Sequence, residues 1–179
     1  MKNLVEIDGS VAKVKMSHGF VTLVDKADLE LIADYRWYAH KRPRWKTHYV
    51  LANDYSRKTM LQLHTLLVPY SDGLVVDHKN RNGLDNRRCN LRRCTQAQNH
   101  ANGPKYRNNT SGYKGVVWVG RANKYAAGIS LNGKRKHLGY FVDPIDAAVA
   151  YNKAAFESWG EFAYLNDVNQ NTNQIKEQG

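Results

Sequence analysis

The stretch VVDHKNRNGLDNRRCNLRRCTQAQNH, residues 75–100, constrains the fold of this chain most. A short apolar run ends in the pair Asp77-His78, and a long Asn-rich segment then leads to a second short run, NLRRC. Thr95-x-x-Gln98 has the spacing of a capping box, in which the hydroxyl accepts from the amide three residues later. The stretch therefore predicts a strand, a long loop, a second strand and a helix, and it is either a basic surface loop or a split metal site.

The charge of the chain indicates its partner. Its 179 residues include 27 Lys and Arg against 16 Asp and Glu, a formal net charge of +11. Such an excess favours a polyanion, nucleic acid first and an anionic membrane surface second. No apolar run approaches the roughly 20 residues of a membrane span, and MKNLVEIDGS is not typical of a signal peptide. We therefore expect an intracellular, cytoplasmic protein with no membrane contact.

The Asp-His pair suits the cleavage of a phosphodiester. A neutral histidine can take a proton from water near pH 7, and a hard divalent cation binds oxygen ligands. In a strand the side chains of Asp77 and His78 alternate, but at the strand end both can border one cleft. Asn99 or His100, on the following helix, could supply a second metal ligand. A zinc site of Cys89, Cys94 and His100 is disfavoured because no fourth ligand is evident.

This stretch resembles the HNH endonuclease motif of homing endonucleases and related phage enzymes. The resemblance implies a ββα-metal core around one divalent ion, Mg²⁺ or Mn²⁺. It implies that His78 is the general base and that Asn90 orients the long loop. It also implies that Asp77 is the acidic metal ligand and that Asn99 occupies the third position of the motif. His100 follows directly, so the third position stays open between the two residues.

Cations surround this motif and are predicted to contact the DNA backbone, with a solvated basic face as the alternative. In the motif they are Lys79, Arg81, Arg87, Arg88, Arg92 and Arg93. A basic and aromatic stretch nearer the N-terminus, with Arg42, Arg44 and Lys46, is a third candidate contact. His64, in QLHTLLV, is interpreted as a packed helix residue, with a phosphate contact as the alternative.

The C-terminal part predicts a small sheet and one helix. YKGVVWV is a strand, and Asn132-Gly133 predicts a hairpin between the two strands that follow. DPIDAAVAYNKAAFESWG predicts a helix with Asp143 as N-cap and Gly160 as its stop. Its apolar face is expected to hold Ile145, Ala148, Val149, Asn152, Phe156 and Trp159.

SGYKGVVW, KYAAGI, LGYF and DAAVAYNKAA resemble the AP2 DNA-binding domain, whose sheet implies contact with duplex DNA. The residues expected to bind DNA here are Lys114, Trp118, Arg121, Lys124, Tyr125, Lys134, Arg135, Lys136 and His137. Trp118 and Tyr125 could instead be core aromatics.

Together these observations predict an α+β fold. Its segments are a β-rich region with possible DNA contact (1–60), an HNH core (61–102), a linker (103–112), an AP2-like domain (113–166) and a disordered tail (167–179). Its predicted function is that of a homing-type DNA endonuclease, encoded by a phage or mobile element, which acts on double-stranded DNA. A homodimer or a second event would be needed to cut both strands. The alternatives are a DNA-binding regulator that does not cut and an RNA-directed nuclease, which a base-reading sheet disfavours.

Overall fold

The computed structural model describes residues 2–41, 43, 47–131 and 133–168. The predicted contacts Arg42, Arg44 and Lys46, the turn residue Asn132 and the tail from 169 onward lie outside these residues. The chain divides into two compact units, residues 1–96 and 97–179, which are described separately here. The described residues form several small antiparallel sheets with few helices, a mixed architecture consistent with the predicted α+β class.

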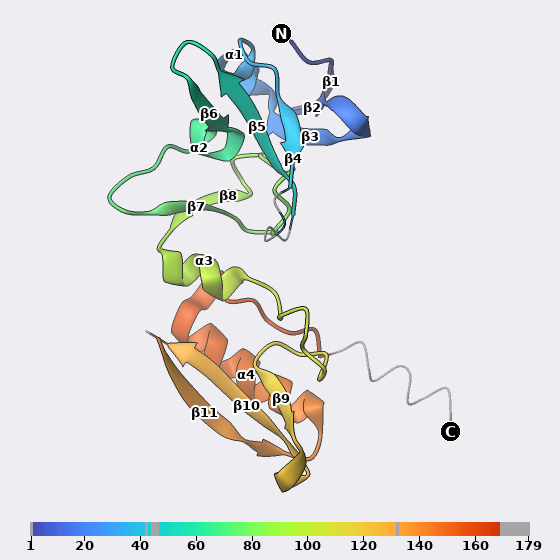
Figure 1. The fold of residues 1–179 in the computed structure, drawn as a ribbon, viewed down its shortest axis with the longest axis vertical. Coiled ribbons are helices and arrows are strands. Elements are labelled where there is room, and N and C mark those ends of the chain that lie inside the picture. Colours follow the sequence, from blue (N-terminus) through green and yellow to red (C-terminus); the bar gives the residue numbers. More distant parts are fainter. Residues whose placement is uncertain (1, 42, 44–46, 132, 169–179) are drawn as a thin grey trace. The chain divides into compact units, whose positions relative to one another are not determined.

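The first unit contains two three-stranded antiparallel sheets and one hairpin (Figure 1). The first sheet has the strands β1 (Val5–Asp8), β2 (Val11–Lys15) and β3 (Val21–Asp25). The second sheet has the strands β4 (Tyr38–His40), β5 (Tyr49–Asp54) and β6 (Thr59–Gln62). The hairpin pairs β7 (Val75–His78) with β8 (Leu91–Cys94). The short helices are η1 (Ser17–Gly19), η2 (Lys26–Asp28), α1 (Leu29–Ile32) and α2 (Leu63–Leu67).

Alternating side chains of these strands build the core of the first unit. Thr22 and Val24 are fully buried on one face of β3, as their alternation predicts. Trp37 lies among the core residues, and its indole Nε1 donates to the carbonyl of Ile32 at 2.9 Å. The predicted strands of the motif are confirmed as β7 and β8.

Asp25 stands at the N-cap position of η2 but binds elsewhere. Asp25 precedes η2, but its side chain makes no capping hydrogen bond there. Its carboxylate Oδ2 accepts instead from the backbone N–H of Arg88, at 2.7 Å, 63 residues along the chain. The residue therefore holds a distant loop rather than starting a helix.

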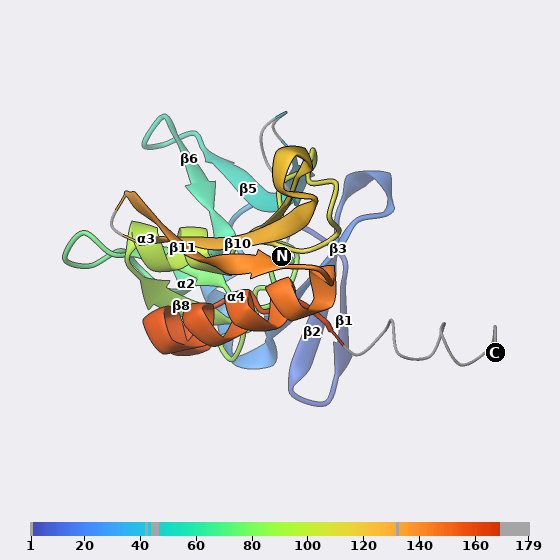
Figure 2. The same cartoon turned by 90° about the horizontal axis from the view of Figure 1, so that it is seen from below.

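The second unit is a three-stranded antiparallel sheet with one long helix along a face (Figures 1 and 2). Its strands, in the spatial order β11-β10-β9, are β9 (Val116–Val119), β10 (Lys124–Leu131) and β11 (Lys134–Phe141). Its helices are α3 (Gln96–Asn102), η3 (Gly120–Ala122), α4 (Pro144–Trp159) and η4 (Gly160–Phe162). Asp143 Oδ1 accepts from the N–H of Ile145 at 2.7 Å, so the predicted cap is confirmed.

The predicted apolar face of α4 is confirmed only in part: Ala148 is buried and Trp159 packs against the core, but Val149 and Phe156 are exposed. The helix buries Ala147, Ala148, Tyr151 and Ala155, whereas Phe156 is 60% exposed. Small side chains let the helix approach the sheet closely, and Ala147 and Ala148 pack with Val116 and Ala127 there. The buried stripe of this helix therefore combines three alanines with Tyr151, and it leaves Val149 and Phe156 outside.

The segment 103–112, predicted as a linker, has no helix or strand but is held by hydrogen bonds. Asn109 Nδ2 donates to the carbonyls of Tyr113 and Val116 at 2.9 and 3.1 Å. Ser111 Oγ donates to the carbonyl of Val116 at 2.8 Å. The segment is thus tied to the first strand of the sheet. None of the helices in the described ranges is long and apolar enough to span a bilayer.

Candidate functional site

The hairpin of β7 and β8 carries the predicted site in the first unit. Its antiparallel register pairs Asp77 with Arg92 and His78 with Leu91. The last hydrogen bond before the loop runs from the N–H of Lys79 to the carbonyl of Asn90 across the hairpin, at 2.9 Å. Asp77 and His78 therefore stand at the mouth of the long loop, and both are buried.

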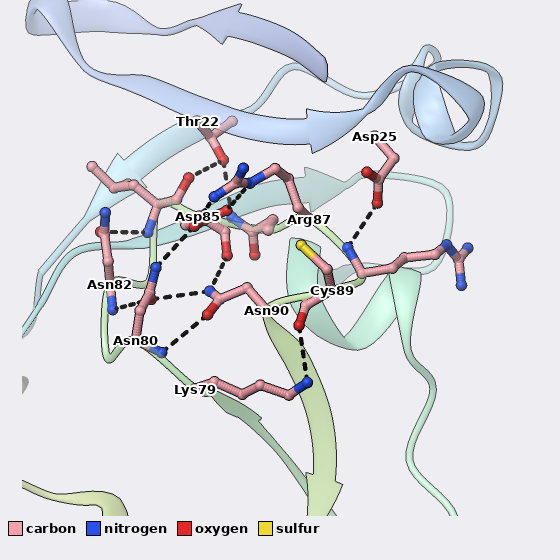
Figure 3. Close-up of polar contacts among 12 residues, drawn as sticks. Thr22, Asp25, Lys79, Asn80, Asn82, Asp85, Arg87, Cys89 and Asn90 are labelled. Carbon is pink, nitrogen blue, oxygen red and sulfur yellow. Dashed lines mark hydrogen bonds and ion pairs between the residues drawn. The ribbon is translucent and has the colours of Figure 1, made fainter. Parts of the chain in front are cut away.

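The loop between the strands is braced by Asn90. Its Nδ2 donates to Asn80 Oδ1 at 3.0 Å and to the carbonyl of Asp85 at 2.7 Å. Its Oδ1 accepts from the N–H of Asn80 at 3.0 Å. Figure 3 shows Asn80, Asp85, Arg87 and Asn90 turned toward one another inside the loop. Asn90 thus uses both ends of its amide within the loop.

The first sheet holds the loop from outside. The N–H of Leu23 donates to the carbonyl of Leu84 at 2.9 Å, and the N–H of Asn86 donates back to Leu23 at 2.8 Å. Thr22 Oγ1 also donates to the Leu84 carbonyl, at 2.8 Å. The β-rich N-terminal region is therefore a scaffold for the loop, a role that the sequence did not predict.

His78 is oriented by a side chain that sequence reasoning missed. Its Nε2 lies 3.1 Å from Asn86 Oδ1. The amide nitrogen of Asn86 donates to the carbonyl of Gly83 at 3.2 Å and to Thr22 Oγ1 at 2.9 Å. A carbonyl can only accept, so Oδ1 faces His78 and Nε2 must carry the proton. In the neutral ring the lone pair is then on Nδ1.

Burial controls the charge of His78. Loss of solvent lowers the pKa of its imidazole, against the hydrogen bond with Asn86 and the charges of Asp77 and Asp85, which raise it. The ring is therefore neutral at neutral pH. A neutral imidazole with its lone pair on Nδ1 can accept a proton from water.

Asp77 is held by an ion pair. Arg92 donates to Asp77 Oδ2 from Nε at 3.1 Å and from Nη2 at 3.0 Å. Both side chains are largely buried, 9% exposed for Arg92 and 7% for Asp77. Both of these hydrogen bonds end on Oδ2, so the pair fixes the orientation of the carboxylate. The donor set at the motif is of oxygen atoms, which suits a hard cation such as Mg²⁺ or Mn²⁺.

Asn99 and His100 lie on α3, in the second unit. The helix begins at Gln96, after the single residue Thr95 that follows β8. The predicted helix is confirmed, and the ligand role of the two residues stays a prediction. In the described ranges no three His, Cys, Asp or Glu side chains gather into a metal cluster. A single Mg²⁺ does not need one, since it usually keeps several waters beside one or two carboxylates and substrate phosphates.

Three of the six cations predicted to contact DNA in this motif face acidic partners. Arg87 Nη2 lies 2.7 Å from Asp85 Oδ2, and Arg88 Nη2 lies 2.7 Å from Asp28 Oδ1. Arg92 pairs with Asp77 as described above. Lys79 Nζ donates to the carbonyl of Cys89 at 2.9 Å, and Arg93 Nε donates to that of Pro69 at 3.1 Å. Arg81, also predicted, is exposed.

The predicted contacts of the second unit fall on two faces of its sheet. Trp118 pairs with Tyr125, and the neighbouring pair Val116 and Ala127 packs against α4. Trp118 and Tyr125 therefore lie on the helix side of the sheet, with their ring centroids 4.9 Å apart.

The opposite face carries cations of β11. The side chain of Arg135 lies over Gly128. A Cβ atom added to Gly128 would come within 2.9 Å of Arg135 Nε. His137 pairs with Gly128 on the same face, and its ring lies 4.7 Å from that of Tyr140. Lys134 and Lys136 are also exposed on β11, Lys124 begins β10 and Arg121 lies in η3.

Lys114 has a structural use that the sequence did not predict. Its Nζ donates to the carbonyls of Ala101 and Gly103 at 2.7 and 2.5 Å, and it lies 5.5 Å from the centre of the Tyr164 ring. These contacts tie the end of α3 to the start of the sheet.

Comparison with known proteins gives two similarities. A family model for HNH endonucleases matches residues 68–101, which include the hairpin and all of α3 except its last residue. A protein of Acanthamoeba polyphaga mimivirus, described as an uncharacterized HNH endonuclease, is 31% identical over 144 residues. The match covers 77% of this chain and 70% of the relative. No solved structure matches the chain.

Proposed function

This chain belongs to the HNH endonuclease family, and from that premise we propose that it hydrolyses phosphodiester bonds of double-stranded DNA with His78 as general base. The observation that carries the proposal is the hydrogen bond between His78 Nε2 and Asn86 Oδ1. It holds the proton on Nε2, so Nδ1 is the nitrogen that accepts one.

The proposed reaction is a direct hydrolysis. His78 Nδ1 takes a proton from a water molecule as the water oxygen attacks phosphorus in line. The bond from phosphorus to the 3′ oxygen breaks, and this oxygen takes a proton from solvent water, which leaves a 3′ hydroxyl and a 5′ phosphate. One such site cuts one strand, so a double-strand break needs a dimer or a second event.

A single divalent cation, Mg²⁺ or Mn²⁺, fits the oxygen donors of the motif. Asp77 would hold it together with Asn99, or with His100 in the other assignment. When bound, such an ion stabilises the negative charge that develops on the phosphate and on the leaving oxygen. Arg92 keeps the Asp77 carboxylate in one orientation by binding Oδ2, which supports this role.

Targeting to DNA is proposed for the second unit. Its resemblance to the AP2 domain, the net charge of +11 and the exposed cations on β11 support this role. Because Trp118 and Tyr125 lie on the helix side of the sheet, a contact through the open face would use Arg135, His137 and Tyr140. A homing-type role in a mobile element is proposed on the resemblance, and the viral origin of the relative is in keeping with it.

The experiment is a nicking assay on supercoiled plasmid with Mg²⁺ or Mn²⁺. We expect the wild type to convert plasmid to the open circular form, and His78→Ala to do so at least about 100-fold more slowly. His18→Asn is the matched control, because His18 is an exposed histidine of the same unit at φ 59, which Asn tolerates.

Two outcomes would overturn the proposal. No nicking by the wild type with either ion would leave the alternative, a DNA-binding regulator that does not cut. Equal nicking by the wild type and His78→Ala would remove His78 as the base.

A further inference from the structure

Three rings from three elements meet beside the proposed base. The ring of His64, on α2, lies 5.0 Å from that of His78, on β7, with 65° between their planes. The ring of Tyr49, on β5, lies 5.8 Å from His78 at 63° and 5.6 Å from His64. His78 therefore has two rings packed against it, both steeply inclined to its own plane.

His64 has no hydrogen bond that explains an imidazole at this position. Its side chain is 5% exposed, and its Nδ1 is buried without a hydrogen-bond partner among the residues that the structure describes. A buried polar atom of a structural side chain is normally satisfied, and an unsatisfied one costs stability. The prediction that His64 is a packed helix residue is confirmed, but its unsatisfied Nδ1 does not stabilise the fold.

His64 is an uncharged ring throughout the working pH range. Burial, and then the neighbouring charge of His78, lower the pKa of His64 to about 3. A cation next to the proposed base would oppose proton uptake by it, and His64 supplies none. His64 therefore presents an uncharged planar ring to His78.

The hydrogen bond to Asn86 does not by itself fix the plane of the His78 ring. It is made at Nε2, which lies nearer than Nδ1 to the Cβ–Cγ axis about which the ring turns. Rotation about that axis therefore moves Nδ1 further than Nε2, out of the plane in which it meets water. Inclined rings on the flanks of His78 block this rotation directly.

We propose that His64 is a positioning residue, whose ring fixes the plane of the His78 imidazole and thereby aims Nδ1 at the attacked water. The proposal rests on the proposed nuclease function and deepens it. It assigns a role to a residue on α2 that lies outside the matched motif, residues 68–101.

The test compares two apolar replacements that both remove Nδ1. His64→Leu keeps much of the volume but no flat ring, and His64→Phe keeps a flat neutral ring. We expect His64→Leu to lower kcat for plasmid nicking by about 10- to 100-fold with KM unchanged, since small misplacement of a reacting group has effects of this size. We expect His64→Phe to stay within about threefold of the wild type, since it preserves the geometry on which that effect depends.

Leu67→Ala is the structural control. Leu67 lies on the same helix and is 2% exposed, so its truncation disturbs the packing of α2 without removing a ring from beside His78. With rates corrected for the folded fraction by near-ultraviolet circular dichroism, Leu67→Ala should nick at the wild-type rate. A purely structural role of His64 would make the His64 variants behave like Leu67→Ala.

A second readout does not depend on nicking. Carbon relaxation of the labelled His78 ring in DNA-free protein should show more motion in His64→Leu than in the wild type or in His64→Phe. Unchanged ring motion and unchanged kcat in His64→Leu would overturn the positioning role. So would an equal loss of kcat in both His64 variants, or a change confined to KM. A wild type that does not nick but shows the expected ring motion would instead sink the nuclease function alone.

Discussion

Asn86 is not among the site residues predicted from the sequence, but we expect its replacement to lower both the stability of the protein and its nicking rate. The side chain is fully buried and makes three hydrogen bonds, to His78, Thr22 and Gly83. Asn86→Ala removes all three and leaves the Nε2 hydrogen of His78 without its acceptor. At about 1 kcal/mol for each bond, and about 1–3 kcal/mol for a buried group left unsatisfied, the unfolding free energy should fall by roughly 4–6 kcal/mol.

The effect of Asn86→Ala on the reaction is separate. Without its acceptor the His78 ring can place its proton on either nitrogen, so the lone pair is no longer fixed on Nδ1. A general base contributes typically about 10²- to 10⁴-fold, so we expect nicking to slow by about 100-fold or more. The assay is single-turnover nicking at saturating protein, corrected for the folded fraction from urea unfolding in the same buffer.

Thr22→Val is the matched comparison. It removes the acceptor for one Asn86 N–H and the donor to the Leu84 carbonyl but leaves the contact of Asn86 with His78. We expect it to cost about 1–3 kcal/mol of stability, with little change in rate. If Asn86→Ala nicks within about threefold of the wild type, the orientation of His78 by Asn86 is refuted.

Three further predictions concern single contacts. Arg92→Ala removes the guanidinium that pairs with the buried Asp77 carboxylate, so urea unfolding should show a loss of about 3–5 kcal/mol. The Arg87 guanidinium lowers the pKa of Asp85 from its usual 3.8, so this pair stabilises the fold above pH 4 and the stabilisation is lost as the pH falls through the lowered pKa. Urea midpoints measured from pH 6 to pH 2 should therefore fall less steeply for Arg87→Met than for the wild type. Asp143→Ala removes the cap of α4 and should cost about 1 kcal/mol in thermal unfolding.

Local signals explain what could be predicted from the sequence. A short apolar run ending at His78, a polar segment and a second run before Thr95 predict strand, loop, strand and helix, and the structure has them in that order. Asp143 and Pro144 likewise predicted the start of α4. Each of these signals lies within a few residues of the element that it predicts.

Partners distant in the chain explain what could not be predicted. Thr22 and the Leu84 carbonyl are 62 residues apart, and Arg88 and Asp28 are 60 apart. Sequence shows a row of arginines after His78, but it does not show which acidic side chains they meet. Neither the prediction of DNA contacts nor the alternative of a solvated basic face therefore included these ion pairs.

The helix α4 and His64 show two other limits. The apolar stripe of α4 was chosen by side-chain size, whereas the sheet accepts its small residues and leaves Phe156 exposed. His64 stands out as a histidine in the apolar run QLHTLLV, and this signal was available. Its meaning depends on the His78 ring beside it, which becomes a neighbour only when α2 and β7 pack together.

The central claim is that His78 performs the chemistry rather than the binding of DNA. The most direct test measures plasmid affinity by filter binding with Ca²⁺ and then single-turnover nicking with Mg²⁺, for the wild type and His78→Ala. The account predicts equal affinity and a nicking rate at least about 100-fold lower in the variant. Equal rates, or a loss of affinity that accounts for the whole loss of rate, would contradict it.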